Sequence, residues 1–516
     1  MIEAKLRAAR TRGYYRSVDL FAGCGGMTLG FHRAGFRCVA SVEHNEHARA
    51  SHSMNFAGLV PAGEYRAHGD ITALAPIDAV RHLSPLFPDP EASIDIVIGG
   101  PPCQAFSRLG RAALWDLAGQ KHAHGQDERA TMYEHFLRYV VDLKPLAFVI
   151  ENVREIGKFV GRNVAEEIAA TGEELGYEVR YTILNATWYG VPQLRERLFL
   201  VGIHKGLGCV PEFPPIERTC ELPVGYSTAR SGRGHQQVLP PDDHFVDHAK
   251  RRRRTTPSVT AQEAFSDLPP IFHHLDGRAG KGVPRDPDKP SEYQGRGSAF
   301  SQEMRSWPGF ETNGAFSGHV IRYTPRDYET FRRMPHGGMY PEALAVAEEI
   351  FVERLAEAEQ RLGHRIESTD PVWGEIRKAT VPPYKSHRYP NKFRKMHPNR
   401  PARTVPAHIG KDAYSHIHYD SDQARGISLR EAARLQSFPD AFRLQGSMNQ
   451  RLVQIGNAVP PLLAYALAKT LANQFAPRVR QSRPPGPARR SFGRPASTAP
   501  VSEPHREASV QAVSPK

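Results

Sequence analysis

Short apolar runs alternate with amphipathic stretches from residue 16 to about residue 203. The apolar runs, rich in β-branched and aromatic residues, are SVDLF, FRCVASVE, IDIVIGG, LAFVIEN, VRYTILNA and RLFLVGI. Between them, ERATMYEHFLRYVVDL and NVAEEIAATGEELG carry apolar residues at the period of a helix. Strands that alternate with helices in this way predict an α/β fold with a mostly parallel, doubly wound sheet.

The pattern changes after residue 204, where proline, glycine, histidine and arginine become frequent and the apolar runs become short. One helix is predicted over residues 341–363, because Leu344, Phe351, Leu355 and Leu362 form one apolar stripe opposite an acidic face. It is expected to pack against the protein rather than to read DNA. Two more amphipathic helices are predicted, within SLREAARLQSFPD and QIGNAVPPLLAYALAKTLANQF.

These changes of texture divide the chain into four parts. Residues 1–204 form the predicted α/β domain, and residues 205–452 form a second region that is long enough to contain an insertion. Residues 453–475 are predicted to be a C-terminal helix that returns to the first domain. Residues 476–516 are rich in proline, arginine and serine, which predicts a disordered basic tail.

Composition narrows the class of protein and its compartment. The chain has 516 residues and a formal net charge of +13, which suits a polyanionic partner such as nucleic acid. No apolar run is long enough to cross a bilayer, and the basic N-terminus lacks the apolar core of a signal peptide. Five cysteines without CxxC spacing argue against disulfides and zinc, so a cytoplasmic protein without a metal site is expected.

The stretch SVDLFAGCGGMTLGF predicts a strand, a glycine-rich turn and a helix. Gly23, Gly25 and Gly26 lie in the turn, and Glu43 follows 20 residues after Gly23, the spacing at which a carboxylate can bind ribose hydroxyls. A pyrophosphate-binding fingerprint would have glycine at position 28, where this chain has Thr28. A nucleoside without phosphates, such as S-adenosyl-L-methionine, therefore fits better, although a tight strand-to-helix turn without a ligand has the same pattern.

Other candidate side chains follow or precede strands, where open α/β sheets bind ligands. Cys103 follows IDIVIGGPP, Glu151 lies near the end of LAFVIEN, and Arg195 and Arg197 begin QLRERLFLVGI. Taken singly, each has an ordinary structural explanation: a buried thiol, a helix-capping carboxylate and a surface arginine pair. Their joint appearance in this order favours a catalytic site.

The ordered motifs resemble those of the DNA cytosine-5 methyltransferases, in particular the prokaryotic restriction-modification type. The matching blocks are DLFAGCGGMTLGF, VEHN, GDI, GGPPCQAFS, ENV, QLRERLFLVG, RPARTVPA and QIGNAVPPLLA. They extend from residue 19 to residue 464, with an unmatched interval from about 205 to 399. The resemblance implies a Rossmann-like, S-adenosylmethionine-dependent methyltransferase fold, with residues 205–452 forming a smaller target recognition domain.

The resemblance also implies catalytic roles. Cys103 would be the nucleophile that adds to carbon 6 of cytosine, because carbon 5 is too weak a nucleophile without covalent activation. Glu151 would hold N3 and the amino group of the base, Arg195 would stabilise charge on the base, and Arg197 would support Glu151 or the loop. The target base inside a duplex would have to be flipped out. In the loop, Gln104 and Ser107 would approach the DNA.

For the cofactor, the resemblance implies S-adenosyl-L-methionine bound by residues from both ends of the chain. Phe21 would pack on the adenine, Glu43 would bind the ribose, and Asp70 would bind the adenine amino group beside Ile71. Asn457 would reach the methionine end. His44 departs from the family pattern, which often has a hydrophobic or aromatic residue there. The expected partner is double-stranded DNA, together with a cognate restriction endonuclease acting on the same site, and the protein is expected to be a monomer.

Four other functions compete with this interpretation. Amino-group methyltransferases carry Asp, Asn or Ser before Pro-Pro and an aromatic residue, whereas here the prolines precede Cys103. A transfer-RNA cytosine-5 methyltransferase would share the catalytic blocks but would not need the long interval before RPARTVPA. An inactive DNA-binding regulator would have little reason to keep the set Cys103, Glu151, Arg195 and Asn457 together. A nicotinamide dehydrogenase is disfavoured by Thr28 and would leave Cys103 unexplained.

Overall fold

A computed structural model describes residues 1–84, 89, 91–102, 132–158, 163–220, 243–248, 252–276, 285–387, 389 and 392–476. Residues 1–475 form one compact unit, and residues 476–516 form another, which contributes only Ala476 to the described residues. The predicted disordered tail therefore lies outside them. Every helix within the described ranges is too short or too polar to cross a membrane.

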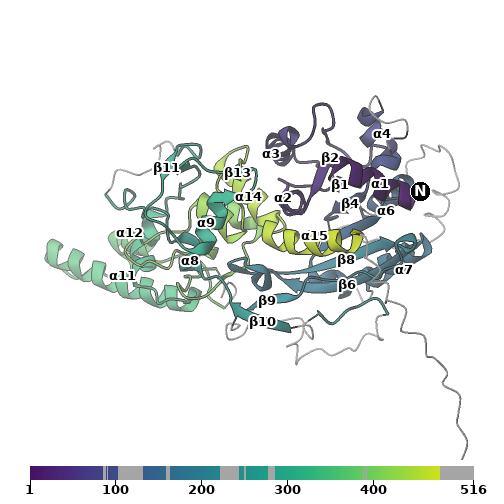
Figure 1. Cartoon of the computed structure of the whole chain (residues 1–516). Helices are drawn as coiled ribbons and strands as arrows, with labels where there is room; N and C mark the ends of the chain where they lie inside the picture. Colours follow the sequence, from purple (N-terminus) through teal and green to yellow (C-terminus); the bar gives the residue numbers. More distant parts are fainter. Residues whose placement is uncertain are drawn as a thin grey trace, which may run out of the picture. The chain divides into compact units, whose positions relative to one another are not determined.

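The centre of the fold is a seven-stranded sheet in the order β3-β2-β1-β4-β5-β8-β6 (Figure 1). Only β8 is antiparallel to its neighbours β5 and β6, and the other adjacent pairs are parallel. The strands are β1 (Tyr15–Leu20), β2 (Phe36–Val42), β3 (Arg66–His68), β4 (Ile96–Gly99), β5 (Ala147–Asn152), β6 (Tyr177–Asn185) and β8 (Glu196–His204). The predicted α/β class and mixed, doubly wound sheet are confirmed.

Helices cover both faces of this sheet, and alternation along the strands explains why. In β4, Ile96 and Ile98 belong to one buried cluster and Val97 belongs to the other. The first face is covered by α2 (Gly26–Arg33), α3 (Glu46–Phe56) and α15 (Pro461–Phe475). The opposite face is covered by α4 (Pro76–Val80), α6 (Met132–Leu143) and α7 (Val164–Glu174). The helix α1 (Ile2–Arg12) precedes β1.

The region after β8 consists of short elements around a few helices. Its strands are β9 (Ile216–Thr219), β10 (Arg252–Pro257), β11 (Ser291–Glu292), β12 (Ser306–Trp307), β13 (Phe310–Glu311), β14 (Ala315–Phe316) and β15 (Ala402–Arg403), while the short strand β7 (Gln193–Leu194) lies just before β8. Its helices are α8 (Ala261–Phe265), α9 (Ala299–Arg305), α10 (Tyr328–Arg333), α11 (Tyr340–Leu362), α12 (Pro371–Thr380), α13 (Leu429–Leu435) and α14 (Met448–Asn457). β15 pairs with β7, which returns the chain to the sheet domain.

The predicted helix over 341–363 exists as α11, which extends away from the central sheet in Figure 1. It ends at Gly363, whose left-handed φ of 74° closes the helix. Phe351 is buried as expected, but Leu362 is 45% exposed, so the predicted stripe is wrong at its C-terminal end. The buried positions instead include the alanines Ala343 and Ala347, which allow close packing.

Two predictions near the C-terminus need correction. The segment from QIGN onwards, predicted as one helix over 453–475, is divided into α14 and α15. Pro460 and Pro461 explain the break, because proline lacks an N–H donor and restricts the residue before it. The predicted amphipathic helix in SLREAARLQSFPD is α13, and all seven of its residues are buried, including Arg430, Glu431 and Arg434.

A separate short segment, residues 243–248, docks on β6. The N–H of Tyr181 donates to the carbonyl of His244, and the N–H of Val246 donates to the carbonyl of Tyr181, both at 2.9 Å. The His244 ring lies between two glutamates of α7, bonded to Glu166 through Nδ1 and 3.2 Å from Glu173 through Nε2. Burial would lower the pKa of His244, but these two carboxylates outweigh it and raise the pKa.

We expect the docking of residues 243–248 to weaken as the pH rises above neutrality. Because the folded-state pKa of His244 is above its ordinary 6.5, its contribution is complete below pH 6.5 and is lost as the pH rises through the folded-state pKa. Amide hydrogen exchange at Tyr181 and Val246, corrected for intrinsic exchange, should show lower protection at pH 8 than at pH 6. In H244Q this pH dependence should disappear; if it persists unchanged, His244 is not its source.

Candidate active site

A glycine-rich turn joins β1 to α2 and holds three residues in left-handed backbone conformations. Phe21 has a φ of 56°, Gly23 of 56° and Gly25 of 98°. A Cβ at Gly25 would lie 2.2 Å from an aromatic ring of α3, and a Cβ at Gly26 would lie 2.3 Å from the carbonyl oxygen of Val459. The turn therefore needs glycine for its backbone shape and for its close approach to α3 and to the chain before α15.

Phe21 is the residue of this turn with a large side chain. A left-handed conformation costs a non-glycine residue about 1–2 kcal/mol. Strain of this kind persists where the surroundings impose it, often beside ligand sites. The Phe21 ring is only partly buried and packs at the margin of the core.

Glu43 follows β2 and faces the same turn. Its two carboxylate oxygens accept hydrogen bonds from the backbone N–H groups of Gly23, at 2.8 Å, and Asn45, at 2.7 Å. Each oxygen keeps a second lone pair that can accept a further hydrogen bond. Asp70 follows β3 and is exposed, and hydrogen bonds from the hydroxyl and N–H of Thr72 lower its pKa.

A buried polar chain beneath the turn was missed by sequence reasoning. The Thr28 hydroxyl donates to Asp19, His52 Nε2 lies 3.0 Å from the Thr28 oxygen, and His52 Nδ1 lies 2.9 Å from the Tyr65 hydroxyl. Burial lowers the pKa of His52 to about 3, so the ring is neutral, and burial raises the pKa of Asp19 to about 7. Thr28, which departs from the dinucleotide fingerprint, thus ties α2 to β1 and α3. No sequence motif signals these pairings.

Glu151, near the end of β5, forms the second part of the site. Its Oε1 lies 3.0 Å from Nε of Arg197, and the missing side chain of Gly100 leaves space beside Oε2. Burial raises the pKa of Glu151, although the two arginines of β7–β8 counteract it. The next residue, Asn152, donates to the carbonyl of Pro101 at 2.9 Å, which fixes the end of β4 against the end of β5.

Arg195 is buried, and its charge acts on Glu151 together with that of Arg197. Its side chain is 1% exposed, and its two terminal nitrogens donate to the carbonyls of Val405 and Gly456, both at 3.1 Å. These bonds join the guanidinium to the segments RPARTVPA and QIGN. Of the two arginines, Arg197 is the one in contact with Glu151.

Asn457, the last residue of α14, is exposed, and its neighbours are held from two sides. Arg195 holds the carbonyl of Gly456, and a Cβ at Gly456 would lie 2.3 Å from the carbonyl oxygen of Pro406. Two residues after Asn457, Val459 packs on the glycine-rich turn. The C-terminal segment therefore lies between the glycine turn and the arginine pair.

Several predicted residues complete or fall outside this arrangement. Ile71 is buried next to Asp70. Cys103, Gln104 and Ser107 lie outside the described residues, whereas Pro101 and Pro102 before them are described. Among the described residues, no group of three or more histidine, cysteine, aspartate or glutamate side chains is arranged to hold a metal ion.

Comparison with protein families matches residues 15–264 and 338–473 to the family described as C-5 cytosine-specific DNA methylase. These ranges cover about three quarters of the chain. The unmatched interval is therefore 265–337, shorter than the interval of about 205 to 399 that the motif blocks suggest.

Individual proteins agree with this match. The chain is 33% identical over 464 residues to a protein of Oceanobacillus iheyensis assigned as type II methyltransferase M.OihORF3336P, covering 88% of this chain and 94% of that protein. It is 30% identical over 472 residues to type II methyltransferase M.AgeI of Thalassovita gelatinovora, covering 88% and 99%. A crystal structure of a protein assigned as a DNA modification methyltransferase, encoded within an E. coli prophage, shares the fold with a TM-score of 0.55 and 22% identity, covering 89% and 99%.

Substitutions at Arg195 and Arg197 should differ in their effect on the stability of the protein. We expect Arg195→Lys to lower the free energy of unfolding by about 1–3 kcal/mol, because one of two buried carbonyls loses its donor. Arg197→Lys should change it by less, because lysine keeps a cation beside the Glu151 carboxylate and no fully buried carbonyl loses its donor. Urea unfolding followed by circular dichroism measures both values. Equal effects in the two variants would contradict the structural assignment of Arg195.

Proposed function

Since the chain belongs to the C-5 cytosine-specific DNA methylase family, we propose that this DNA (cytosine-5-)-methyltransferase modifies one cytosine within a specific duplex sequence, with S-adenosyl-L-methionine as the methyl donor. The observation that carries the proposal is the convergence of three parts: the glycine turn with Glu43, the Glu151–Arg197 pair, and residues 456–459 between them. A nucleoside subsite and a base subsite thereby share one segment of chain.

The residues around the turn fit S-adenosyl-L-methionine. Glu43 offers two acceptor oxygens to ribose hydroxyls, Phe21 offers a ring face to the adenine, and Asp70 keeps one carboxylate oxygen without a protein hydrogen bond among the described residues. Asn457 is exposed beside Gly456 and would meet the methionine end. When bound, this cofactor supplies a methyl group on a sulfonium, which is a good leaving group.

Cys103 would begin the reaction by adding its thiolate to carbon 6 of the flipped cytosine. The ring electrons then move to carbon 5 while N3 gains a proton, and carbon 5 becomes nucleophilic enough to take the methyl group. Methyl transfer leaves the donor as a neutral thioether. A base removes the proton from carbon 5, N3 returns its proton to Glu151, and the thiolate leaves carbon 6, which restores the aromatic ring. Cys103 is regenerated, so atoms and charge balance over the cycle.

Glu151 would hold the edge of the base that changes its protonation. A carboxyl group whose pKa is raised by burial keeps a proton to higher pH, so it can donate to N3 as the thiolate adds. Arg197 lies against the same carboxyl group and orients it. In this arrangement Arg197 takes the position beside the base, and Arg195 acts from behind by holding Val405 and Gly456.

The names of the relatives support a biological role. Both curated relatives above are named type II methyltransferases. We infer that this chain acts on double-stranded DNA as a monomer in the cytoplasm and protects sites that a cognate endonuclease would cleave. The region 205–452 would supply target recognition. A transfer-RNA substrate remains the alternative that the substrate test below distinguishes.

The first test is methyl transfer itself. Incubation with mixed-sequence duplex DNA and tritiated S-adenosyl-L-methionine should label DNA, and nucleoside analysis should place the label in 5-methylcytosine. Unmodified transfer RNA in parallel should remain unlabelled. Label in RNA alone would favour the alternative, and no label in either nucleic acid would contradict the proposed function.

The second test addresses the nucleophile. Wild-type protein should form a covalent complex with DNA that contains 5-fluorocytosine, because fluorine at carbon 5 blocks the final elimination. Cys103→Ala should bind the same DNA without forming this complex on a denaturing gel. The matched control is Cys220→Ala, which removes a half-buried thiol hydrogen-bonded to Thr187 and should leave the adduct intact. An adduct in the Cys103 variant would exclude that role.

A further inference from the structure

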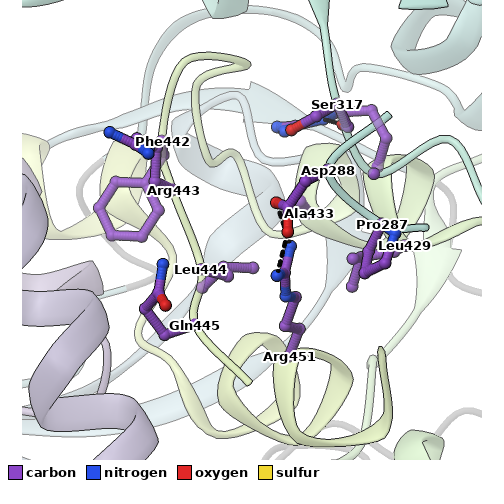
Figure 2. A pocket seen from close by; sticks show the side chains of 12 residues that line it. Pro287, Asp288, Ser317, Leu429, Ala433, Phe442, Arg443, Leu444, Gln445 and Arg451 are labelled. Carbon is purple, nitrogen blue, oxygen red and sulfur yellow. Dashed lines mark hydrogen bonds and ion pairs between the residues drawn. The ribbon is translucent and has the colours of Figure 1, made fainter. Parts of the chain in front are cut away.

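A small pocket lies where the unmatched interval 265–337 meets the family-matched C-terminal part (Figure 2). Asp288 and Ser317 come from the interval, and Arg430, Arg443 and Arg451 come from the C-terminal part. The cavity has a volume of about 120 Å³. Cavities for nucleosides and similar ligands are about 300–1,000 Å³, so this pocket suits a single small polar group.

The centre of the pocket is one ion pair. The two terminal nitrogens of Arg451 donate to the two carboxylate oxygens of Asp288, both at 2.7 Å, and Figure 2 shows the groups face to face. Nε of Arg451 donates to the carbonyl of Gly446 at 2.8 Å, which holds the guanidinium in place. The arginine side chain is 9% exposed, whereas the aspartate side chain is 67% exposed. The cation is therefore built into the protein, and the anion approaches it from solvent.

Arg430 and Arg443 differ in what they contribute to this pocket. Arg430 is buried and donates to the carbonyls of Ser317 and Pro439, so its donors are directed to the backbone. Arg443 is exposed. The hydrogen bond and charge of Arg451 lower the pKa of Asp288, and the charge of Arg443 lowers it further, so Arg443 is close enough to act on this carboxylate. The pocket thus offers one preorganised cation and one exposed cation to an anion.

The pocket is attached to the cofactor side of the protein. Arg451 lies on α14, the helix that ends at Asn457. The adjoining loop packs on α3, since the Gln445 N–H donates to the Ser51 hydroxyl at 2.7 Å. An anion bound at Arg451 would therefore contact the same helix that carries Asn457, a proposed cofactor-binding residue.

A carboxylate and a phosphate present similar pairs of oxygens to a guanidinium fork. We propose that Arg451, assisted by Arg443, binds a phosphate of the DNA backbone, and that Asp288 occupies this site as an internal surrogate when DNA is absent. The inference rests on the proposed function, since it concerns the same duplex substrate. Phosphate contacts position a protein on DNA without reading its sequence, so the effect should appear with any duplex.

Because Asp288 is exposed, its replacement by a DNA phosphate at Arg451 costs little free energy. An ion pair with one exposed partner contributes about 1 kcal/mol or less, so releasing Asp288 reduces DNA affinity by no more than about fivefold. If Asp288 competes with DNA, replacing it with a neutral residue should tighten DNA binding. If the Asp288–Arg451 pair is purely structural, its loss should leave DNA binding unchanged or weaken it. The sign of the change therefore separates the two roles.

The experiment measures the affinity of the full-length protein for a fluorescently labelled duplex as a function of KCl. We expect Asp288→Asn to bind about two- to fivefold tighter, in line with the loss of a competing exposed pair. Arg443→Gln, an exposed substitution that should not impair folding, should bind more weakly with a salt slope shallower by up to about 0.9. Asp288→Glu, which keeps the carboxylate, should resemble wild type.

Asp286→Asn is the matched control for net charge, because Asp286 is exposed two residues away and accepts a bond from the Asp288 N–H rather than from Arg451. It should tighten binding less than Asp288→Asn. Equal tightening in both variants, or none in Asp288→Asn, would overturn the inference. Methyl transfer by the wild-type protein is measured separately: if it occurs while Asp288→Asn gains no affinity, only this inference fails. If wild type neither binds nor methylates the duplex, the proposed function fails as well.

Discussion

The buried guanidinium of Arg434 is the interaction on which the arrangement of both subsites depends. It is fully enclosed and bonded to two carboxylates, Asp267 and Asp440. Enclosing a charge costs several kcal/mol unless its hydrogen bonds are satisfied, and here one acid lies six residues along the chain from Arg434 and the other lies 167 residues away. The α13 helix can therefore lie wholly inside the protein, and the chain after α8 must return to it.

Hydrogen bonds of two buried amide side chains, Gln436 and Gln193, connect α13 to the active site. Gln436 donates to the carbonyl of Ile455 at 2.6 Å, and Gln193 donates to Gln436 at 3.0 Å and accepts from the N–H of Val405 at 2.7 Å. Arg195 then bonds to Val405 and Gly456. Because buried amides and guanidinium groups tolerate few geometries, these bonds place the QIGN segment between the glycine turn and Glu151 without any contact to substrate.

Sequence patterns predicted what depends on local chemistry. The sheet strands, the turn around Gly23 and the position of Glu43 follow from periodicity, glycine geometry and spacing, and the structure agrees. The burial of α13 could not be predicted, since its partner Asp267 lies 167 residues from Arg434 in the chain. The bonds of Arg195 to Val405 and Gly456 could not be predicted for the same reason: alternation along a strand shows which face a side chain takes, but not which distant carbonyl it meets. The geometry of Cys103 stays a prediction.

Burial decides which of the arginine–carboxylate pairs beside these helices is fixed and which can exchange its anion. Arg434 and its partners have no solvent access, so removing one acid would leave an uncompensated charge. Arg451 pairs with a carboxylate that is mostly hydrated, so water or another anion can replace it at small cost. Both pairs connect the interval 265–337 to the family-matched part of the chain. The buried Arg434–Asp267 pair fixes the position of the interval. The exposed Arg451–Asp288 pair is the one in which, under the proposal above, a DNA phosphate would replace the carboxylate.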